Sequence, residues 1–135
     1  MFHTKQNGFT VTEVIIVLII IAVLTIVLLP NLQTYMHRSR RSDALKTILH
    51  LQVAEEKYRT TNTTYGNLSN LSESTNSSDG YYTMSITSNA ASTYTISATA
   101  TGTQASDTDC TNFTLTFASG ATTKTSTPNT DCWSH

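Results

Sequence analysis

The stretch KQNGFTVTEVIIVLIIIAVL, residues 5–24, decides the fold, because it opens a long apolar run that contains one charged residue. From Phe9 to Leu29 there are 21 residues, and Glu13 is the only charge among them. A helix of that length measures about 30 Å, the thickness of the hydrocarbon core of a bilayer. The run therefore predicts a membrane-spanning helix, and it raises the question of why a carboxylate stands inside it.

The apolar run is too long for the core of a secretory signal peptide, and no small-x-small cleavage pattern follows it. Charge and composition disagree on its orientation. Arg38, Arg40, Arg41 and Lys46 follow the run while only Lys5 and the initial amine precede it, which by the positive-inside rule places the C-terminal half in the cytoplasm. The hydroxyl-rich second half and its two cysteines favour export instead, and we expect export.

The second half of the chain is polar and slightly acidic. From position 61 onward it has one lysine against five acidic residues, and Ser, Thr and Asn alternate with apolar residues. This composition argues against a polyanion partner for the head and predicts a solvated β surface. Cys110 and Cys132 lack the CxxC spacing of a redox or zinc site. In an exported head we expect a disulfide worth roughly 3 kcal/mol; in a cytosolic head they would be two free thiols.

Glu13 itself has two interpretations from physics alone. It lies four residues after Phe9, so it can sit at the level of the lipid headgroups. Alternatively it pairs with a cation that another copy of the chain supplies, since charged groups inside a membrane are usually retained for a partner.

Four features together resemble the N-terminus of type IV prepilins. They are a short basic leader, Gly8, the run Phe9-Thr10-Val11-Thr12-Glu13, and a proline, Pro30, late in the apolar stretch. The resemblance implies that a prepilin peptidase cuts between Gly8 and Phe9 on the cytoplasmic side and methylates the new amine of Phe9. It also implies that Glu13 meets the Phe9 amine of a neighbouring subunit. Such pairing stabilises a buried charge only in the correct register, so Glu13 would set the axial step of a filament.

Pro30 predicts a kink in one long helix, because proline lacks the N–H and its ring displaces the carbonyl four residues before it. The alternative is that the helix ends there, at the membrane surface. In assembled filaments of the resembled family the segment before such a proline can unwind, and Val23–Leu29 is the corresponding segment.

Helical spacing continues after Pro30 and predicts an amphipathic second half of the helix over residues 30–60. Two apolar rows form a wide stripe suited to docking on a sheet. They are Ala44, Ile48, Leu51, Ala54 and Tyr58, and beside them Leu45, Leu49 and Val53. A mixed-charge end follows at residues 55–59, and residues 54–66 resemble the helix end of PilE- and ComP-type minor pilins.

The remaining residues predict a connecting loop over 61–80 and an antiparallel sheet over 81–135. Period-two alternation marks three strands, in YYTMSIT, YTISATA and FTLTFAS. One sheet face is apolar and would bury against the helix stripe. The predicted class is α+β: a long N-terminal helix, half membrane-spanning at 9–29, packed on a small sheet as in type IV pilins, with residues 1–8 as leader. We expect Trp133 to pack on the sheet beside the disulfide.

No catalytic, cofactor or metal motif stands out, and we expect a non-enzyme without cofactors. His37 and His50 lie about 220° apart around a helix, which excludes a shared metal ion. Asp107, Asp109 and Asp131 could gather around calcium, but we favour solvated loop carboxylates.

The resemblance leads to a structural subunit, minor or major, of a type IV pilus. Its expected partners are other pilin subunits, the prepilin peptidase, the inner-membrane assembly machinery and lipid before assembly. Its expected location is the inner membrane and then the surface pilus, with roles in adhesion, twitching motility or DNA uptake. One alternative is a ComP-like DNA-uptake receptor, for which the helix offers Arg38, Arg40, Arg41 and Lys46 and the head only Lys124. The other is a pseudopilin of a type II secretion system.

Overall fold

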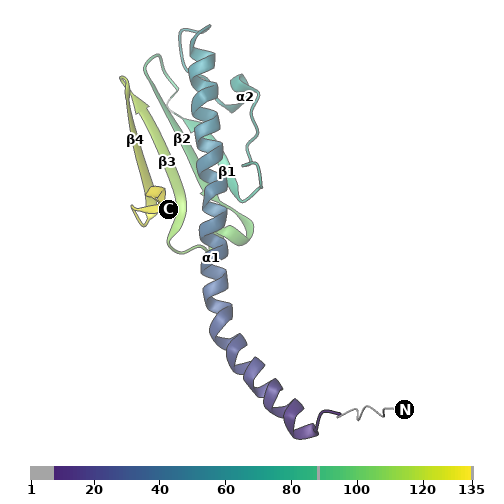
Figure 1. The fold of residues 1–135 in the computed structure, drawn as a ribbon. Helices are drawn as coiled ribbons and strands as arrows, with labels where there is room; N and C mark the ends of the chain where they lie inside the picture. Colours follow the sequence, from purple (N-terminus) through teal and green to yellow (C-terminus); the bar gives the residue numbers. More distant parts are fainter. Residues whose placement is uncertain (1–7, 88, 135) are drawn as a thin grey trace, which may run out of the picture. The chain divides into compact units, whose positions relative to one another are not determined.

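The computed structural model describes residues 8–87 and 89–134, except for the side chains of residues 29–31. The chain forms two compact units, Met1–Tyr35 and Met36–His135. Two helices, four strands and two short 3₁₀ segments follow one another along the described residues (Figure 1). They are α1 (Val11–Arg59), α2 (Leu68–Leu71), β1 (Tyr82–Thr87), β2 (Thr93–Ala100), η1 (Gly102–Ser106), β3 (Cys110–Ala118), β4 (Ala121–Pro128) and η2 (Cys132–Ser134). This confirms the predicted α+β class with a long N-terminal helix.

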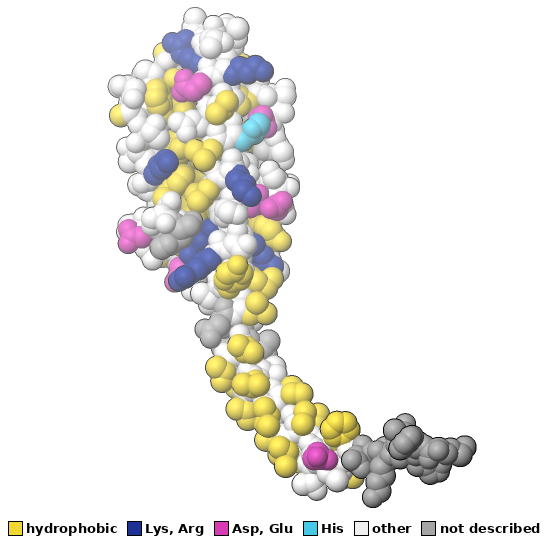
Figure 2. Space-filling view, in the orientation of Figure 1, with side chains coloured by type: hydrophobic (Ala, Val, Ile, Leu, Met, Phe, Trp, Pro, Cys, Tyr) yellow, Lys and Arg dark blue, Asp and Glu magenta, His cyan; other side chains and the backbone are white. Residues whose placement is uncertain are grey.

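The first unit contains the N-terminal part of α1. Its segment Val11–Leu28 is long and apolar enough to cross a membrane, and none of it is buried inside the structure. Hydrophobic side chains cover much of this part of the helix in Figure 2. The hydroxyl of Thr25 donates to the carbonyl of Ile21 at 2.7 Å, so this polar group needs no partner from outside the helix. The predicted span therefore exists as a helix whose apolar surface has no cover within the described chain.

Pro30 lies inside α1, and the helical assignment continues through it. Its ring belongs to the side chains outside the described residues, so the predicted kink stays a prediction. The helix begins at Val11, two residues after Phe9, the predicted first residue of the mature chain, and it ends at Arg59.

In the second unit, α1 covers one face of the sheet. Ala44, Ile48 and Leu51 are fully buried against it, as the apolar spacing predicted. The second predicted row does not dock as a whole. Leu45 is partly buried, but Leu49 and Val53 are 47% and 69% exposed. The apolar stripe that docks is therefore narrower than predicted, because Leu49 and Val53 lie on the side of α1 that is away from the core.

The sheet is fully antiparallel with strand order β1-β2-β3-β4. Its inner face carries the apolar residues that alternation predicted, in three strands whose register brings them together. The buried members are Tyr82, Met84, Ile86, Tyr94, Ile96, Ala98, Phe113 and Leu115. Offset and edge-on ring contacts tie this core, as between Tyr82 and Phe113 at 5.8 Å.

The fourth strand, β4, was not predicted. It joins β3 through Ser119 and Gly120, which both have positive φ, at 51° and 87°. Two central residues with positive φ suit a tight hairpin whose twist matches the strands. The sequence of β4, ATTKTSTP, has no apolar alternation, and all its residues except Ser126 are exposed. Backbone hydrogen bonds to β3, and not burial of its side chains, therefore hold β4 in the sheet.

The outer face of the sheet carries hydroxyl groups at nearly every position. We name this surface the hydroxyl face, and the strand registers arrange it in three cross-strand rows. The rows are Thr87, Thr95, Thr116, Thr123; then Ser85, Ser97, Thr114, Thr125; then Thr83, Thr99, Asn112, Thr127. All of these residues are exposed or half-buried, which fits the predicted solvated β surface.

The segment between α1 and β1 was predicted as a loop but contains the single-turn helix α2. Asn67 and Asn70 form a reciprocal cap: the amide N–H of each is accepted by the side chain of the other. Further along, the N–H of Met84 donates to Thr75 and Asn76 bridges to Thr83. This segment therefore covers the edge of β1, which limits pairing with other strands there.

Candidate assembly site

The predicted cleavage site lies just before α1. Gly8, Phe9 and Thr10 are outside the helix and exposed, and Phe9 is 88% exposed. A peptide bond outside a hydrogen-bonded helix can adopt the extended conformation that peptidases bind. Cleavage after Gly8 and methylation of Phe9 remain predictions, and the leader residues 1–7 lie outside the described residues.

Glu13 is held by Thr10 at the start of the helix. Both the backbone N–H and the hydroxyl of Thr10 donate to Oε2 of Glu13 at 2.8 Å, and the N–H of Glu13 lies 3.3 Å from the Thr10 hydroxyl oxygen. This is a capping box, in which the residue before the helix and the third helical residue satisfy each other's backbone donors. Thr10 therefore orients the carboxylate that we expect to set subunit register.

The role of Thr10 was missed at the level of sequence, although its signal was present. The spacing Thr10-x-x-Glu13 before an apolar run is the pattern of a capping box. It adds a third interpretation of Glu13, as a helix cap. The cap uses Oε2, while Oε1 of Glu13 has no hydrogen bond within the described residues. One oxygen thus stays available for a cation from outside the chain.

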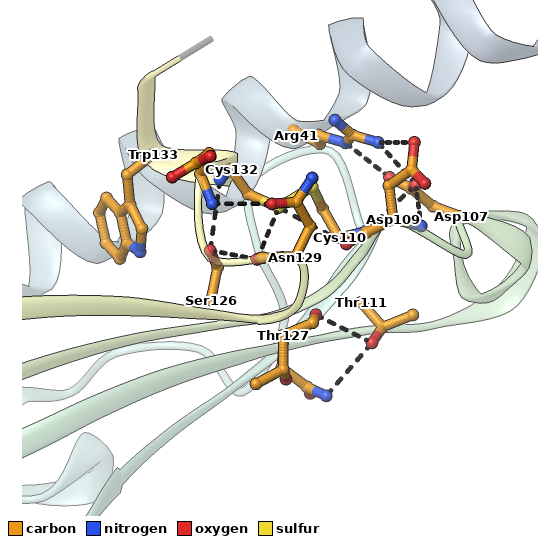
Figure 3. Close-up of a disulfide and its surroundings, with 12 residues drawn as sticks. Arg41, Asp107, Asp109, Cys110, Thr111, Ser126, Thr127, Asn129, Cys132 and Trp133 are labelled. Carbon is orange, nitrogen blue, oxygen red and sulfur yellow. Dashed lines mark hydrogen bonds and ion pairs between the residues drawn. A yellow bond between two sulfur atoms is a disulfide. The ribbon is translucent and has the colours of Figure 1, made fainter.

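In the head, a disulfide joins Cys110, the first residue of β3, to Cys132 in η2 (Figure 3). The two Cα atoms are 6.0 Å apart. Ser126 of β4 donates its hydroxyl to the Asn129 carbonyl and accepts the N–H of Cys132. The predicted disulfide is present, and it ties the C-terminal segment to the sheet.

Trp133 packs on the sheet, as predicted. Its ring meets Phe113 edge-on at 5.8 Å, and its indole N–H donates to the carbonyl of Thr125 at 2.7 Å. The ammonium group of Lys124 lies 5.3 Å from the ring centre. The apolar ring and the indole N–H of Trp133 therefore both have partners inside the head.

Arg41 and Asp107 form a buried ion pair between α1 and the end of η1 (Figure 3). Two parallel hydrogen bonds of 2.7 Å join the guanidinium to the carboxylate, and each residue is 3% exposed. Burial acts to raise the pKa of Asp107, but the hydrogen bonds and charge of Arg41, with the N–H groups of Asp109 and Cys110, hold it below its usual value. The hydrogen bonds to Asp107 in turn raise the pKa of Arg41, against the opposing effect of burial.

This ion pair corrects one sequence interpretation and bears on another. Arg41 was one of the four helix cations offered for contact with DNA, but it is buried and its charge is neutralised by Asp107. Asp107 was expected to be a solvated loop carboxylate, with a calcium ligand as the alternative, and the first expectation is wrong because Asp107 is buried. Its two oxygens already accept from Arg41, Gln104 and backbone N–H groups. Within the described residues no group of three or more His, Cys, Asp or Glu side chains could hold a metal ion.

Glu55 differs most from its predicted place. The sequence placed it in a mixed-charge helix end, where charged side chains are usually solvated, but Glu55 is fully buried. Its Oε2 accepts the N–H of Gly66 at 2.8 Å, while Oε1 has no hydrogen-bond partner among the described residues. Burial raises the pKa of Glu55, and the nearby charge of Glu56 adds to that effect, against the hydrogen bond from Gly66.

Of the α1 cations that the sequence offered for DNA, Arg38 and Lys46 are exposed and Arg40 is half-buried beside Arg38. Arg40 lies 4.7 Å from the ring centre of Tyr81 and donates to the Thr103 hydroxyl. Figure 2 shows the Lys and Arg side chains of this face spread over the head instead of gathered in one patch. They are separate positive groups available for contacts with phosphate or carboxylate.

Comparisons with known proteins agree with this arrangement. A family model described as type IV minor pilin ComP, DNA uptake sequence receptor, matches residues 30–114, and a model of the prokaryotic N-terminal methylation motif matches residues 3–29. The type II secretion system core protein G of Pectobacterium carotovorum subsp. carotovorum is 33% identical over 61 residues, 45% of this chain and 39% of that protein. The chain thus spans about two fifths of that relative's length.

An exposed apolar helix that begins at a methylation motif, a helix packed on an antiparallel sheet, and a family match over well over half of the 135 residues agree with one another. The chain belongs to the type IV minor pilin ComP family.

Proposed function

We propose that the chain is a subunit of a type IV pilus that enters the filament after a prepilin peptidase removes residues 1–8. The new amine of Phe9 is methylated, and it pairs with Glu13 of a neighbouring subunit. Before assembly the apolar helix anchors the chain in the inner membrane, and the assembly machinery of that membrane supplies the work. The chain itself acts without catalysis.

One observation supports this most strongly: the segment Val11–Leu28 is entirely unburied and apolar, with the carboxylate of Glu13 at its start. A segment of this kind needs either lipid or the helices of other subunits around it. Because Thr10 occupies only Oε2, the free Oε1 of Glu13 can accept a hydrogen bond from an incoming amine. The capping box would hold the Glu13 carboxylate in a defined position, and this position would set the register between neighbouring subunits.

Incorporation of a Glu13→Gln variant into filaments tests the role of the carboxylate. Glutamine keeps the size of the side chain and an oxygen that can accept from Thr10, but it removes the charge. We expect normal amounts in the membrane fraction and roughly tenfold less in sheared filaments, because an unmatched ammonium group is strongly destabilising in an apolar core. Thr12→Val, one residue away and without any change of charge, is the control and should assemble normally. Glu13→Gln that assembles as well as Thr12→Val would refute the pairing.

A second function, reception of DNA for uptake, is favoured by the ComP family match over residues 30–114. The structure leaves Arg38 and Lys46 exposed on α1, with Arg40 beside them, while Arg41 is neutralised. Binding to duplex DNA would then rest on few phosphate contacts, and it would weaken steeply with salt.

Fluorescence anisotropy of labelled duplex DNA with the full chain in detergent tests this second function. The expected result is binding at low salt that weakens at higher salt. In Arg38→Gln or Lys46→Gln the salt slope should fall by about one, because each variant removes one cation from the phosphates. Lys124→Gln, on a strand, serves as the matched control. Absence of binding at low salt would exclude the receptor function for this chain.

A pseudopilin of a type II secretion system remains the third candidate, because the relative from Pectobacterium carotovorum belongs to such a system. Deletion of the gene separates the possibilities. Loss of surface filaments with normal secretion of enzymes supports the pilus subunit, and the reverse supports the pseudopilin.

A further inference from the structure

Glu55 is a fully buried carboxylate whose charge has no counterpart. Its Oε2 accepts the N–H of Gly66 at 2.8 Å, and its Oε1 has no hydrogen-bond partner among the described residues. Within the same part of the chain, Glu55 belongs to none of the ion pairs. A carboxylate that ionises here gives up its hydration and receives a single hydrogen bond in return. The neutral form of Glu55 therefore fits this site better than the charged form.

The titratable and charged groups around Glu55 do not compensate its charge. Glu56, the next residue of α1, places a like charge beside it. Tyr65 before Gly66 and Tyr94 of β2 lie near both carboxylates, and burial raises the pKa of each phenol, so both stay neutral up to alkaline pH. Arg59 lies 5.9 Å from the ring centre of Tyr65 and donates to two backbone carbonyls. The cation at this end of α1 is therefore used elsewhere.

The segment that Glu55 holds follows α1 directly. We name residues 60–72, which include α2, the turn segment. Its backbone is tied to the rest of the head through the N–H of Gly66 on Glu55 and the N–H of Tyr65 on the carbonyl of Ala90. No residue of α2 is fully buried. A segment with few ties and little burial is the part of a fold that opens at the lowest free energy.

The turn segment also forms one wall of a cleft at this end of the head. The cleft has a volume of about 340 Å³. Lys57 and Tyr58 line it from α1, and Asn70 and Leu71 line it from α2, which lies beside the upper part of α1 in Figure 1. Because α2 supplies a wall, any movement of the turn segment changes the shape and the access of this cleft.

We propose that Glu55 is a proton-controlled latch: its neutral carboxyl keeps the turn segment closed on α1, and its ionisation opens that segment so that water reaches Oε1. The proton that leaves Glu55 passes to solvent. The pKa of Glu55 is raised above its unfolded value of 4.5, so the closed form is favoured in acid and is lost as the pH rises through the folded value. The latch does not depend on the proposed pilus function, because every group in it lies in the head.

Hydrogen–deuterium exchange of the full chain in detergent, followed by mass spectrometry of its peptides, tests the latch. Exchange rates of the turn segment between pH 5 and 8 are corrected for the intrinsic effect of pH. In the wild type we expect the corrected rates to rise at least about tenfold, because one pH unit above the folded pKa changes the equilibrium about tenfold. Glu55→Gln keeps an acceptor for Gly66 and does not ionise, so its corrected rates should stay flat.

Two controls distinguish a local latch from loosening of the whole head. Asp131→Asn removes an exposed carboxylate from the C-terminal segment and should keep the wild-type pH dependence. Peptides from β2 in the same samples should show no rise with pH, and equal β2 rates in Glu55→Gln and wild type at pH 5 verify that the variant folds.

Three results would overturn the latch. They are wild-type rates in the turn segment that do not change with pH, a rise that Glu55→Gln shares, and an equal rise in β2. Failure of the pilus function would appear instead in the incorporation assay with Glu13→Gln, which does not involve Glu55.

Discussion

At the scale of single residues, two of the buried carboxylates in the head, Asp107 and Glu55, have opposite environments. Asp107 is satisfied on both oxygens by Arg41 and by backbone N–H groups, whereas Glu55 has one oxygen without a partner among the described residues. The Arg41–Asp107 ion pair therefore stabilises the fold at neutral pH. The carboxylate of Glu55 destabilises the fold when it is ionised.

Arg41→Met tests the ion pair. It leaves the carboxylate of Asp107 buried without its cation, so we expect a loss of about 3–5 kcal/mol in the free energy of unfolding. Fluorescence of Trp133, the only tryptophan, can follow urea unfolding of the full chain in detergent. The control Arg40→Met removes a largely surface interaction and should change stability by less than about 1 kcal/mol. Equal losses in the two variants would contradict the structural role of the pair.

The same pair predicts a pH dependence with a definite sign. The pKa of Asp107 is depressed in the folded state below its unfolded value of 3.8. Its stabilisation is therefore present above pH 3.8 and is lost as the pH falls through the lower folded value. In Arg41→Met this part of the acid unfolding curve should flatten.

Glu55→Gln tests the second group. The pKa of Glu55 is raised above its unfolded value of 4.5, so its stabilisation is present below pH 4.5 and is lost as the pH rises through the folded value. Glutamine keeps an acceptor for Gly66 and does not ionise. We expect urea midpoints of the variant to stay flat from about pH 4 to 8 while those of the wild type fall. Glu56→Gln removes only the neighbouring charge that adds to this shift, so its midpoints should still fall with pH, but less than those of the wild type. A flat wild-type curve would refute the assignment.

At the scale of elements, apolar periodicity predicted the helix and strands that are stabilised by burial of side chains. It missed the elements that are stabilised by backbone hydrogen bonds. Ile48, Leu51 and the inner residues of β1, β2 and β3 were found because each repeats at the period of its element. β4 was missed because its inner position Ser126 and its exposed Thr residues carry no such signal, although Ser119-Gly120 was a readable turn. The single turn of α2 depends on a cap between two Asn side chains and not on a period.

Contacts far apart in sequence could not be predicted at all. Arg41 meets Asp107 across 66 positions, and Glu55 meets the N–H of Gly66 in a turn whose course depends on the whole head. The sequence shows that both residues are charged, but only the packing decides that they are buried. The capping box at Thr10 and Glu13 is the opposite case, since it is local and its pattern was legible.

The disulfide is the covalent tie between β3 and η2, and its removal has a predictable effect on stability. It closes a loop between cysteines 22 positions apart. On the chain-entropy model its loss costs about 3 kcal/mol. Cys110→Ser with Cys132→Ser should lower the urea midpoint of the head accordingly, and reductant should do the same to the wild type but not to the variant. A midpoint that neither treatment changes would show that the tie adds nothing to stability.

At the scale of the whole molecule, the two units of the chain differ in the surface that they expose. The first has apolar surface that needs lipid or other subunits, and the second has a closed core and a mostly polar outer surface. Membership in the ComP minor pilin family fits this division, because a pilin must be both a membrane protein and a filament subunit. The exposed Leu49 and Val53 on α1 add apolar surface in the second unit that other subunits can cover.

The central claim is that the amine of Phe9 becomes free and supplies the cation that Glu13 requires. Intact-mass spectrometry of the chain purified from membranes or sheared filaments tests it most directly. The account predicts a mature protein that begins at Phe9, carries one methyl group on its new terminus and retains the disulfide. A mature protein that still begins at Met1 would contradict it, because the amine that pairs with Glu13 would never form.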